Sequence, residues 1–230
     1  MEIVVHRGTK QIGGCVTEIR TEEARIFIDL GSELPDIKGD TPLETLSING
    51  VTQDGNNCDG VFFTHYHGDH IGMISHVIPQ VPLYMGGAAK DIYITFQKRI
   101  NHNHTLAEER MRTFQAGEEI QVKDISVTPF LVDHSAYDAY MFLIKAQGKK
   151  ILHTGDFRTH GFRGKGVLPM LKKYVGSVDV LIIEGTNFSN GRLHSVSESQ
   201  LQQQAKKLLS SYKYVFVICP STNIDRIASF

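Results

Sequence analysis

The sequence predicts an α/β domain built in layers, with sheets of mixed strand direction. Two observations lead to this prediction. Some apolar runs form hairpin-like pairs, such as 140–145 and 149–153 around Gln147-Gly148, whereas others alternate with helix-like segments. Hairpins give antiparallel strands and strand–helix alternation gives parallel ones, so we expect both kinds of pairing in one domain.

Apolar runs between glycine- and proline-rich turns define the predicted strands. They cover 3–6, 15–20, 25–31, 60–63, 82–84, two strands within 120–132 divided by Lys123-Asp124, 140–145, 149–153, 179–184 and a last buried strand at 214–219. Residues 32–57 are rich in turn formers and predict a long loop with a short helix near 42–46.

Helices are expected at 71–78, 87–104, 168–174 and 197–212. In the second, Ile92, Phe96 and Ile100 are spaced to form an apolar stripe. His102 and His104 lie at its end, where exposure to solvent is the more common outcome than metal ligation. The last helix is expected to begin after Ser197 as N-cap and to point four residues inward, namely Leu201, Ala205, Leu208 and Leu209.

The composition is that of an ordinary globular protein, with 41% hydrophobic and 21% charged residues and a formal net charge of -1. Affinity for an anionic partner must therefore come from local groups. The 3 cysteines lack C-x-x-C spacing, which favours a reducing compartment over a disulfide framework. No signal-like N-terminus or bilayer-length segment is present, so we expect a cytoplasmic protein without a membrane partner; an oligomer remains open.

Four candidate metal ligands lie within six positions: His65, His67, Asp69 and His70. They follow the apolar run 60–63, which argues against a solvated His-rich loop. Imidazole suits zinc and similar ions, and a carboxylate adds a harder ligand. In an extended chain His65 and His67 point to one side, whereas Asp69 and His70 diverge if a helix starts there. This predicts two neighbouring metal positions.

Other predicted strands also end in acids or histidines: Asp29, His134, Asp156 and Glu184. Each alone has an ordinary structural explanation, such as an Asx turn for Asp156. Together with the first cluster they predict a metal site at the strand ends. The expected arrangement has metal one on His65, His67 and His134, metal two on Asp69 and His70, and Asp156 as the bridge. Two metals about 3.5–4 Å apart can hold a bridging hydroxide and hydrolyse a phosphoester or acyl bond.

These residues resemble the metallo-β-lactamase superfamily over essentially the whole chain. The H-x-H-x-D-H signature, the downstream histidine, Gly155-Asp156 and Asp29 carry the resemblance. It implies an αβ/βα four-layer sandwich and two Zn²⁺ ions, although the same ligands accept Mn²⁺. It also implies that Asp29 hydrogen-bonds within the metal loop and fixes a ligand.

Two later segments resemble the β-CASP branch in its ribonuclease J-like form. Residues 183–187 are similar to the acidic motif that follows the metal domain, and 220–227 to the segment that opens the inserted domain. The resemblance implies a metallo-β-lactamase-like domain at 1–219 and only the start of an insertion at 220–230. It makes Asp69 and Glu184 catalytic candidates, with Glu184 orienting a proton-donating histidine. That histidine and a further ligand are expected beyond Phe230, so we expect a truncated, fragmentary site that could be inactive.

Four basic residues follow Asp156 and could steer phosphates towards the metals: Arg158, His160, Arg163 and Lys165. A solvated loop is an equally good interpretation. Ser135 could donate a hydrogen bond to a phosphate oxygen or serve a turn, and Tyr66 could contact substrate or pack.

The leading hypothesis is a metal-dependent ribonuclease J-like nuclease that cleaves RNA phosphodiesters with a metal-bound hydroxide; single-stranded DNA is a further candidate substrate. One alternative is a hydrolase of small acyl compounds such as lactones or thioesters, which the Glu184 and 221–227 motifs disfavour. The other is a catalytically silent scaffold subunit of a processing complex, which the retention of the visible ligands disfavours.

Overall fold

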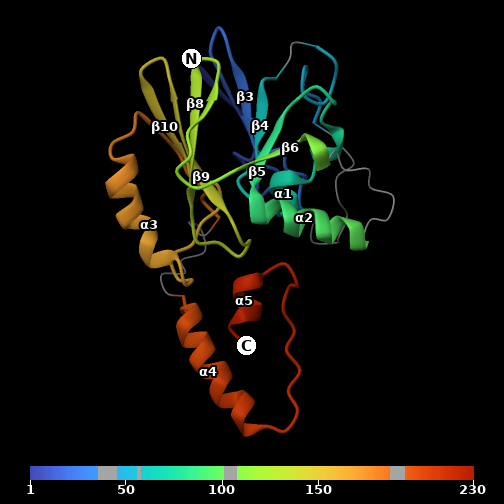
Figure 1. Ribbon diagram of the computed structural model, residues 1–230, viewed down its shortest axis with the longest axis vertical. Coiled ribbons are helices and arrows are strands. Elements are labelled where there is room, and N and C mark those ends of the chain that lie inside the picture. Colours follow the sequence, from blue (N-terminus) through green and yellow to red (C-terminus); the bar gives the residue numbers. More distant parts are fainter. Residues whose placement is uncertain (36–45, 56–57, 101–107, 187–194) are drawn as a thin grey trace.

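The computed structural model describes residues 1–35, 46–55, 58–100, 108–186 and 195–230. Two β-sheets stand face to face in the larger lobe, and a smaller helical lobe projects from one end (Figure 1). The first sheet has six strands in sequence order: β1 (Glu2–Arg7), β2 (Val16–Arg20), β3 (Arg25–Ile28), β4 (Gly60–Phe62), β5 (Leu83–Gly86) and β6 (Met111–Phe114).

The second sheet has five strands in the order β11 (Val180–Ile182), β10 (Lys149–His153), β9 (Tyr140–Ala146), β8 (Ile125–Leu131) and β7 (Ile120–Val122). Both sheets are mixed. Strands β1 to β3 pair antiparallel and β3 to β6 parallel, whereas β10 and β11 are the parallel pair of an otherwise antiparallel second sheet. The predicted mixture of strand directions is confirmed.

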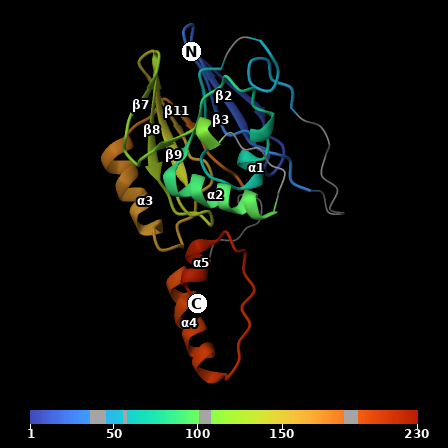
Figure 2. The same cartoon turned by 45° about the vertical axis from the view of Figure 1, so that its right-hand side comes forward.

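Alternation of side chains along the strands creates three apolar layers. In β3, Ile26 and Ile28 face the second sheet, whereas Phe27 faces the helices on the other side. In β9, Phe142 meets the first sheet and Met141 packs towards helix α3. The order is therefore helices, sheet, sheet, helices, which confirms the predicted four-layer arrangement (Figure 2).

Helices α1 (Gly68–Ile71), η1 (Ile74–His76) and α2 (Gly87–Ile100) lie on the outer side of the first sheet. The short η2 (Glu108–Arg110) precedes β6, and α3 (Gly164–Met170) continues as the π-helical η3 (Leu171–Val175) on the second sheet. Two expectations need correction. The helix predicted at 71–78 begins at Gly68 and is split into α1 and η1. In α2, the buried side chains are Ala89, Tyr93 and Ile94, whereas Phe96 and Ile100 are exposed.

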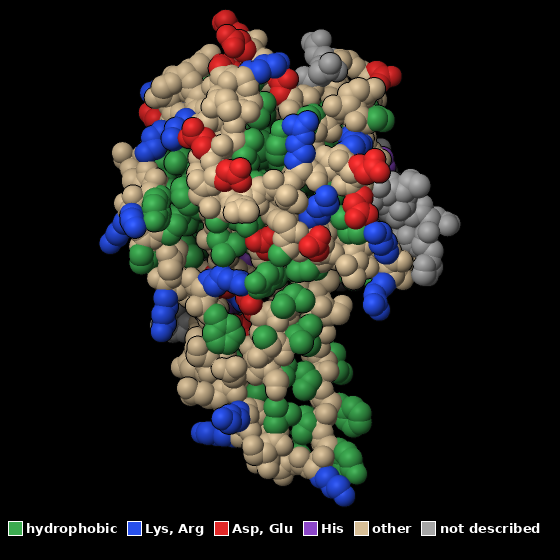
Figure 3. Space-filling view, viewed as in Figure 1, with side chains coloured by type: hydrophobic (Ala, Val, Ile, Leu, Met, Phe, Trp, Pro, Cys, Tyr) green, Lys and Arg blue, Asp and Glu red, His purple; other side chains and the backbone are tan. Residues whose placement is uncertain are grey.

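The smaller lobe consists of α4 (Glu198–Ser211), α5 (Ile224–Ala228) and an extended segment between them. Ser197 caps α4 as predicted: its hydroxyl accepts a hydrogen bond from the Gln200 amide in a capping box. Ala205 is buried, but Leu208 is 57% exposed. The strand predicted at 214–219 is wrong, since this segment joins neither sheet and exposes Phe216 and Ile218 almost fully. Figure 3 shows hydrophobic side chains along this lobe.

The short helix predicted near 42–46 falls almost entirely outside the described residues, as do His102 and His104. The predicted boundary between 219 and 220 lies inside the smaller lobe and stays a prediction. Among the described helices, none combines the length and the apolar character needed to cross a membrane.

Candidate metal centre

The strand ends of the first sheet hold the histidine loop in place. After β3, Asp29 adopts a left-handed backbone with φ 61°, and its N–H donates to the Phe62 carbonyl at 2.9 Å. Its fully buried carboxylate turns onto the start of the loop, accepting from the Thr64 amide at 2.7 Å and the Thr64 hydroxyl at 2.8 Å. The loop therefore leaves β4 with a fixed direction before the first histidine.

Three imidazoles meet at this loop, two from the loop itself and one from the second sheet. Nε2 of His65 lies 3.1 Å from Nδ1 of His67, which in turn lies 3.2 Å from Nε2 of His134. One nitrogen from each lies within 4.8 Å of the others, so the three could hold a metal ion. His134 comes from the end of β8, so the second sheet contributes to the cluster.

A second group combines His65, His70 and Asp156 within the same limit of 4.8 Å. Nε2 of His70 lies 3.4 Å from Oδ1 of Asp156 and 3.7 Å from Oδ2 of Asp69. The other Asp156 oxygen, Oδ2, lies 4.0 Å from Nε2 of His134. Asp156 thus belongs to the second group and also lies near His134 of the first, and its role as a bridge between two metals stays a prediction. The structure adds His65 to the second group, whereas Asp69, which the sequence assigned to metal two, belongs to neither group.

The protonation of these side chains suits a cation. Burial lowers the pKa of His65 well below the ordinary histidine value, and it lowers the pKa of His134 to about 3 and that of His67 less strongly. Neutral imidazoles keep a lone pair for a metal. Three neutral nitrogen donors beside a carboxylate are the donor set that zinc and manganese accept, so the residues present fit such an ion.

Asp29 also orients His70. A carboxylate only accepts hydrogen bonds, so Nδ1–H of His70 donates to Oδ2 of Asp29 at 2.8 Å. Nε2 is thereby left pointing at Asp156 and Asp69. Burial opposes the charged form of His70, but the carboxylates of Asp29 and Asp156 outweigh it and raise its pKa well above the usual value in the metal-free protein.

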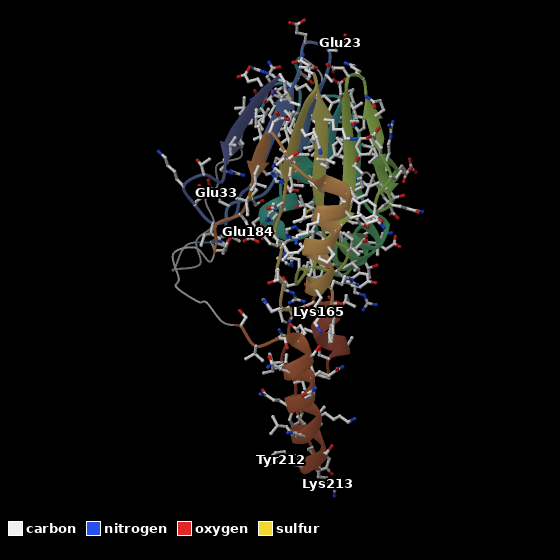
Figure 4. All side chains as sticks on the ribbon, turned by 90° about the vertical axis from the view of Figure 1, so that its left-hand side faces the viewer. Glu23, Glu33, Lys165, Glu184, Tyr212 and Lys213 are labelled. Carbon is white, nitrogen blue, oxygen red and sulfur yellow. The ribbon has the colours of Figure 1, made fainter. Side chains whose placement is uncertain are left out.

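A cavity of about 670 Å³ opens beside the second group. Asp69, His70 and Asp156 line it together with Glu184, which follows β11 (Figure 4). Oε1 of Glu184 accepts a hydrogen bond from the Phe157 amide at 2.8 Å, and burial raises the pKa of Glu184 above its ordinary value. A partly buried carboxylate facing the cavity can therefore act as an acceptor for a polar group within it.

Two residues of the site escaped the sequence analysis. The hydroxyl of Thr64 lies 3.1 and 2.8 Å from the two carboxylate oxygens of Asp29, and 3.0 Å from Nδ1 of His65. His153, at the end of β10, lines the cavity and is buried, which lowers its pKa to about 4. The sequence did contain a signal for His153: it lies at the end of a strand, three residues before Asp156, and the other histidines of the site also lie after strands.

The residues predicted to contact phosphate lie in different surroundings. Ser135 is partly exposed directly after His134. Arg158 and Arg163 face carboxylates: Nε of Arg158 lies 2.8 Å from Oδ1 of Asp133, and Nη1 of Arg163 lies 3.3 Å from Oδ2 of Asp225. Lys165 is exposed in the first turn of α3, near the smaller lobe (Figure 4). Ion pairs with Asp133 and Asp225 thus hold the loop after Asp156 in place.

Comparison with known proteins adds independent information. The family model described as beta-lactamase superfamily domain matches residues 34–213. The chain is 25% identical to "Ribonuclease J" of Mycoplasma genitalium over 98% of its length, and 28% identical to "Probable RNase MJ4" of Methanocaldococcus jannaschii over 81%. It covers 40% and 45% of those proteins, respectively, so it spans less than half of their lengths.

A solved structure shares the fold. The crystal structure of a protein of unknown function from Enterococcus faecalis V583 superposes with a TM-score of 0.79 and 26% sequence identity. The match covers 98% of this chain and 61% of the other.

Proposed function

Because this chain belongs to the beta-lactamase superfamily, we propose that it is the metal-binding part of a ribonuclease J-like nuclease that hydrolyses RNA phosphodiesters. The observation that carries the proposal is the pair of ligand groups that share His65, with Asp156 of the second group 4.0 Å from His134 of the first. The names of the relatives, which describe ribonucleases, supply the substrate class.

We propose that His65, His67 and His134 hold one divalent ion and that His70 and Asp156 contribute to a second, with zinc favoured and manganese accepted. Asp69, whose Oδ2 lies 3.7 Å from Nε2 of His70, is proposed to complete the second site. Bound ions of this kind lower the pKa of water and polarise a phosphoryl oxygen. The chain's own residues supply orientation: Asp29 fixes the tautomer of His70, and Thr64 fixes the carboxylate of Asp29. Glu184 is proposed to orient a proton donor to the leaving oxygen.

The proposed function is tested with end-labelled single-stranded RNA, the matching DNA and a lactone. Cleavage of RNA that stops on chelation and returns with Zn²⁺ or Mn²⁺ is the expected result for the nuclease. Since the chain spans less than half of the relatives' lengths, the assay also uses the chain joined to a complete relative's remaining segment. If both proteins bind metal and open the lactone while RNA and DNA stay intact, the substrate is an acyl compound.

A further inference from the structure

Six charged side chains gather where the smaller lobe meets the larger one. Three come from loops of the larger lobe and three from the smaller lobe: Asp133, Arg158 and Arg163, and Glu198, Asp225 and Arg226. Two of the carboxylates are almost inaccessible, with Asp133 0% and Glu198 2% exposed. Lys, Arg, Asp and Glu are seldom buried unless paired, so this junction needs a specific explanation.

Arg158 joins the two loops that bring metal-ligand candidates from the second sheet. Its main-chain N–H donates to the Asp133 carbonyl at 2.7 Å, and its Nε donates to the Asp133 carboxylate at 2.8 Å. Asp133 directly precedes His134, and Arg158 lies two residues after Asp156. The loops that carry His134 and Asp156 are therefore joined by one main-chain hydrogen bond and by this one guanidinium.

The smaller lobe holds Arg158 from the other side. Nη1 of Arg158 donates to Oε1 of Glu198 at 3.3 Å, and the Glu198 amide donates to the His160 carbonyl at 2.9 Å. Glu198 is itself fixed by Arg226 of α5, which donates two hydrogen bonds at 2.6 and 3.1 Å. The N-terminus of α4 and, through Arg226, helix α5 are thus connected to the loop that follows Asp156.

Uncharged hydrogen bonds connect the smaller lobe to the histidine loop that follows β4 of the first sheet. The Tyr66 hydroxyl donates to the Thr222 carbonyl at 2.7 Å and accepts from the Tyr137 amide at 2.8 Å. Tyr66 stands between His65 and His67, and its ring is buried. The smaller lobe therefore contacts the residue between His65 and His67 as well as the loop that follows Asp156.

The charged junction is not optimised for stability. Oδ2 of Asp133 and Nη2 of Arg158 are buried and make no hydrogen bond among the described residues, although Nη2 lies 3.8 Å from Asp225. Buried ion pairs often contribute little or nothing net compared with apolar packing, and unsatisfied members add cost. A precise geometry is the benefit that such a network can supply.

We propose that Glu198 is a positioning residue for the metal centre: by holding Arg158 it fixes the loops of His134 and Asp156. The smaller lobe is then part of the apparatus that shapes the site. This inference rests on the proposed metal-binding role of the histidine groups, and on no assumption about the substrate.

The test uses the full chain and metal ions alone. Glu198→Gln keeps the shape of the side chain but removes its charge, and Arg226→Gln, at a side chain 33% exposed, perturbs the same network at lower risk to folding. The matched control is Glu119→Gln, which removes an exposed carboxylate paired with Lys145 at 3.1 Å. Zn²⁺ affinity is measured by calorimetry and the ligand field of bound Co²⁺ by visible absorption, with circular dichroism to verify folding.

We expect Glu198→Gln to weaken Zn²⁺ binding by about 10-fold, the lower end of the range for groups that support metal ligands. The Co²⁺ spectrum should change in Glu198→Gln, a smaller loss of affinity should accompany Arg226→Gln, and Glu119→Gln should match the wild type. Folded Glu198→Gln and Arg226→Gln with wild-type affinity and an unchanged spectrum would overturn the proposal. If the wild type itself binds no metal, the proposed function fails first and this inference with it.

Discussion

Replacing Asp29 by asparagine tests whether one buried carboxylate sets the ligand tautomer. Asparagine is nearly isosteric and tolerates the left-handed φ of 61°, so the backbone need not move. Its oxygen can still accept from the Thr64 amide. Its NH₂ group, however, would replace Oδ2, the atom that accepts from Nδ1–H of His70 at 2.8 Å.

Two donors would then face each other, so the neutral form of His70, which is the form that binds a metal, is expected to carry its proton on Nε2. That nitrogen lies 3.4 Å from Asp156, on the side of the proposed metal. A protonated Nε2 has no lone pair for an ion. We expect Zn²⁺ affinity to fall by about 10- to 100-fold, which is about 1.4–2.8 kcal/mol. Losing a charged buried hydrogen bond should also lower the free energy of unfolding by about 1.5–3 kcal/mol.

The assay is calorimetric titration with Zn²⁺, combined with urea unfolding of the metal-free protein. The control is Asp138→Asn, because Asp138 also has a left-handed backbone, φ 63°, and accepts from the Ala89 amide at 3.0 Å and the Tyr140 hydroxyl at 2.6 Å. It should lose stability without losing Zn²⁺. The tautomer argument is refuted if Asp29→Asn binds Zn²⁺ as tightly as the wild type.

Three further predictions concern stability and are measured by urea unfolding. Gly31→Ala should lower the free energy of unfolding by at least about 1–3 kcal/mol, because the added Cβ would lie 1.6 Å from the Asp69 carbonyl oxygen. The control is Gly166→Ala in α3, where the added Cβ has no atom within 4 Å and the free energy of unfolding should stay the same or rise. Ser197→Ala should cost about 1 kcal/mol through loss of the α4 cap; equal stability would contradict this. The hydrogen bond from Arg226 holds the pKa of Glu198 below its ordinary value. The contribution of the Glu198 carboxylate to the free energy of unfolding is therefore present above about pH 4.3, the ordinary pKa, and is lost as the pH falls through the lowered pKa of the folded state. The stability gap between wild type and Glu198→Gln should therefore close in acid; a gap that widens would contradict the assignment.

The grouping of the histidines could be predicted because its signals are local. His65 and His67 alternate after an apolar strand, and His134 and Asp156 also follow strands, so topology alone gathers them at one edge. The participation of His65 in both groups could not be predicted, because it depends on how closely the side chains of His70 and Asp156 approach it in space.

Other features depend on distant partners and therefore could not be predicted. Residues separated by four drift around a helix of 3.6 residues per turn, so the proposed stripe of α2 includes Phe96 and Ile100, which are exposed, and omits Tyr93. The run 214–219 has the composition of a buried strand, yet it has no neighbour to pair with in either sheet. Arg158 is oriented by Glu198, forty positions later, which no local pattern reveals.

The extended run at 214–219 has a practical consequence for the chain in solution. It presents apolar side chains, with Phe216 95% and Ile218 99% exposed, on a backbone that forms no ladder with the described sheets. Short apolar stretches of high β-propensity, without proline or charge, pair readily edge to edge with another copy. The apparent molar mass measured by light scattering should therefore rise with protein concentration, and a charged residue at Phe216 should suppress that rise while leaving the histidine site untouched.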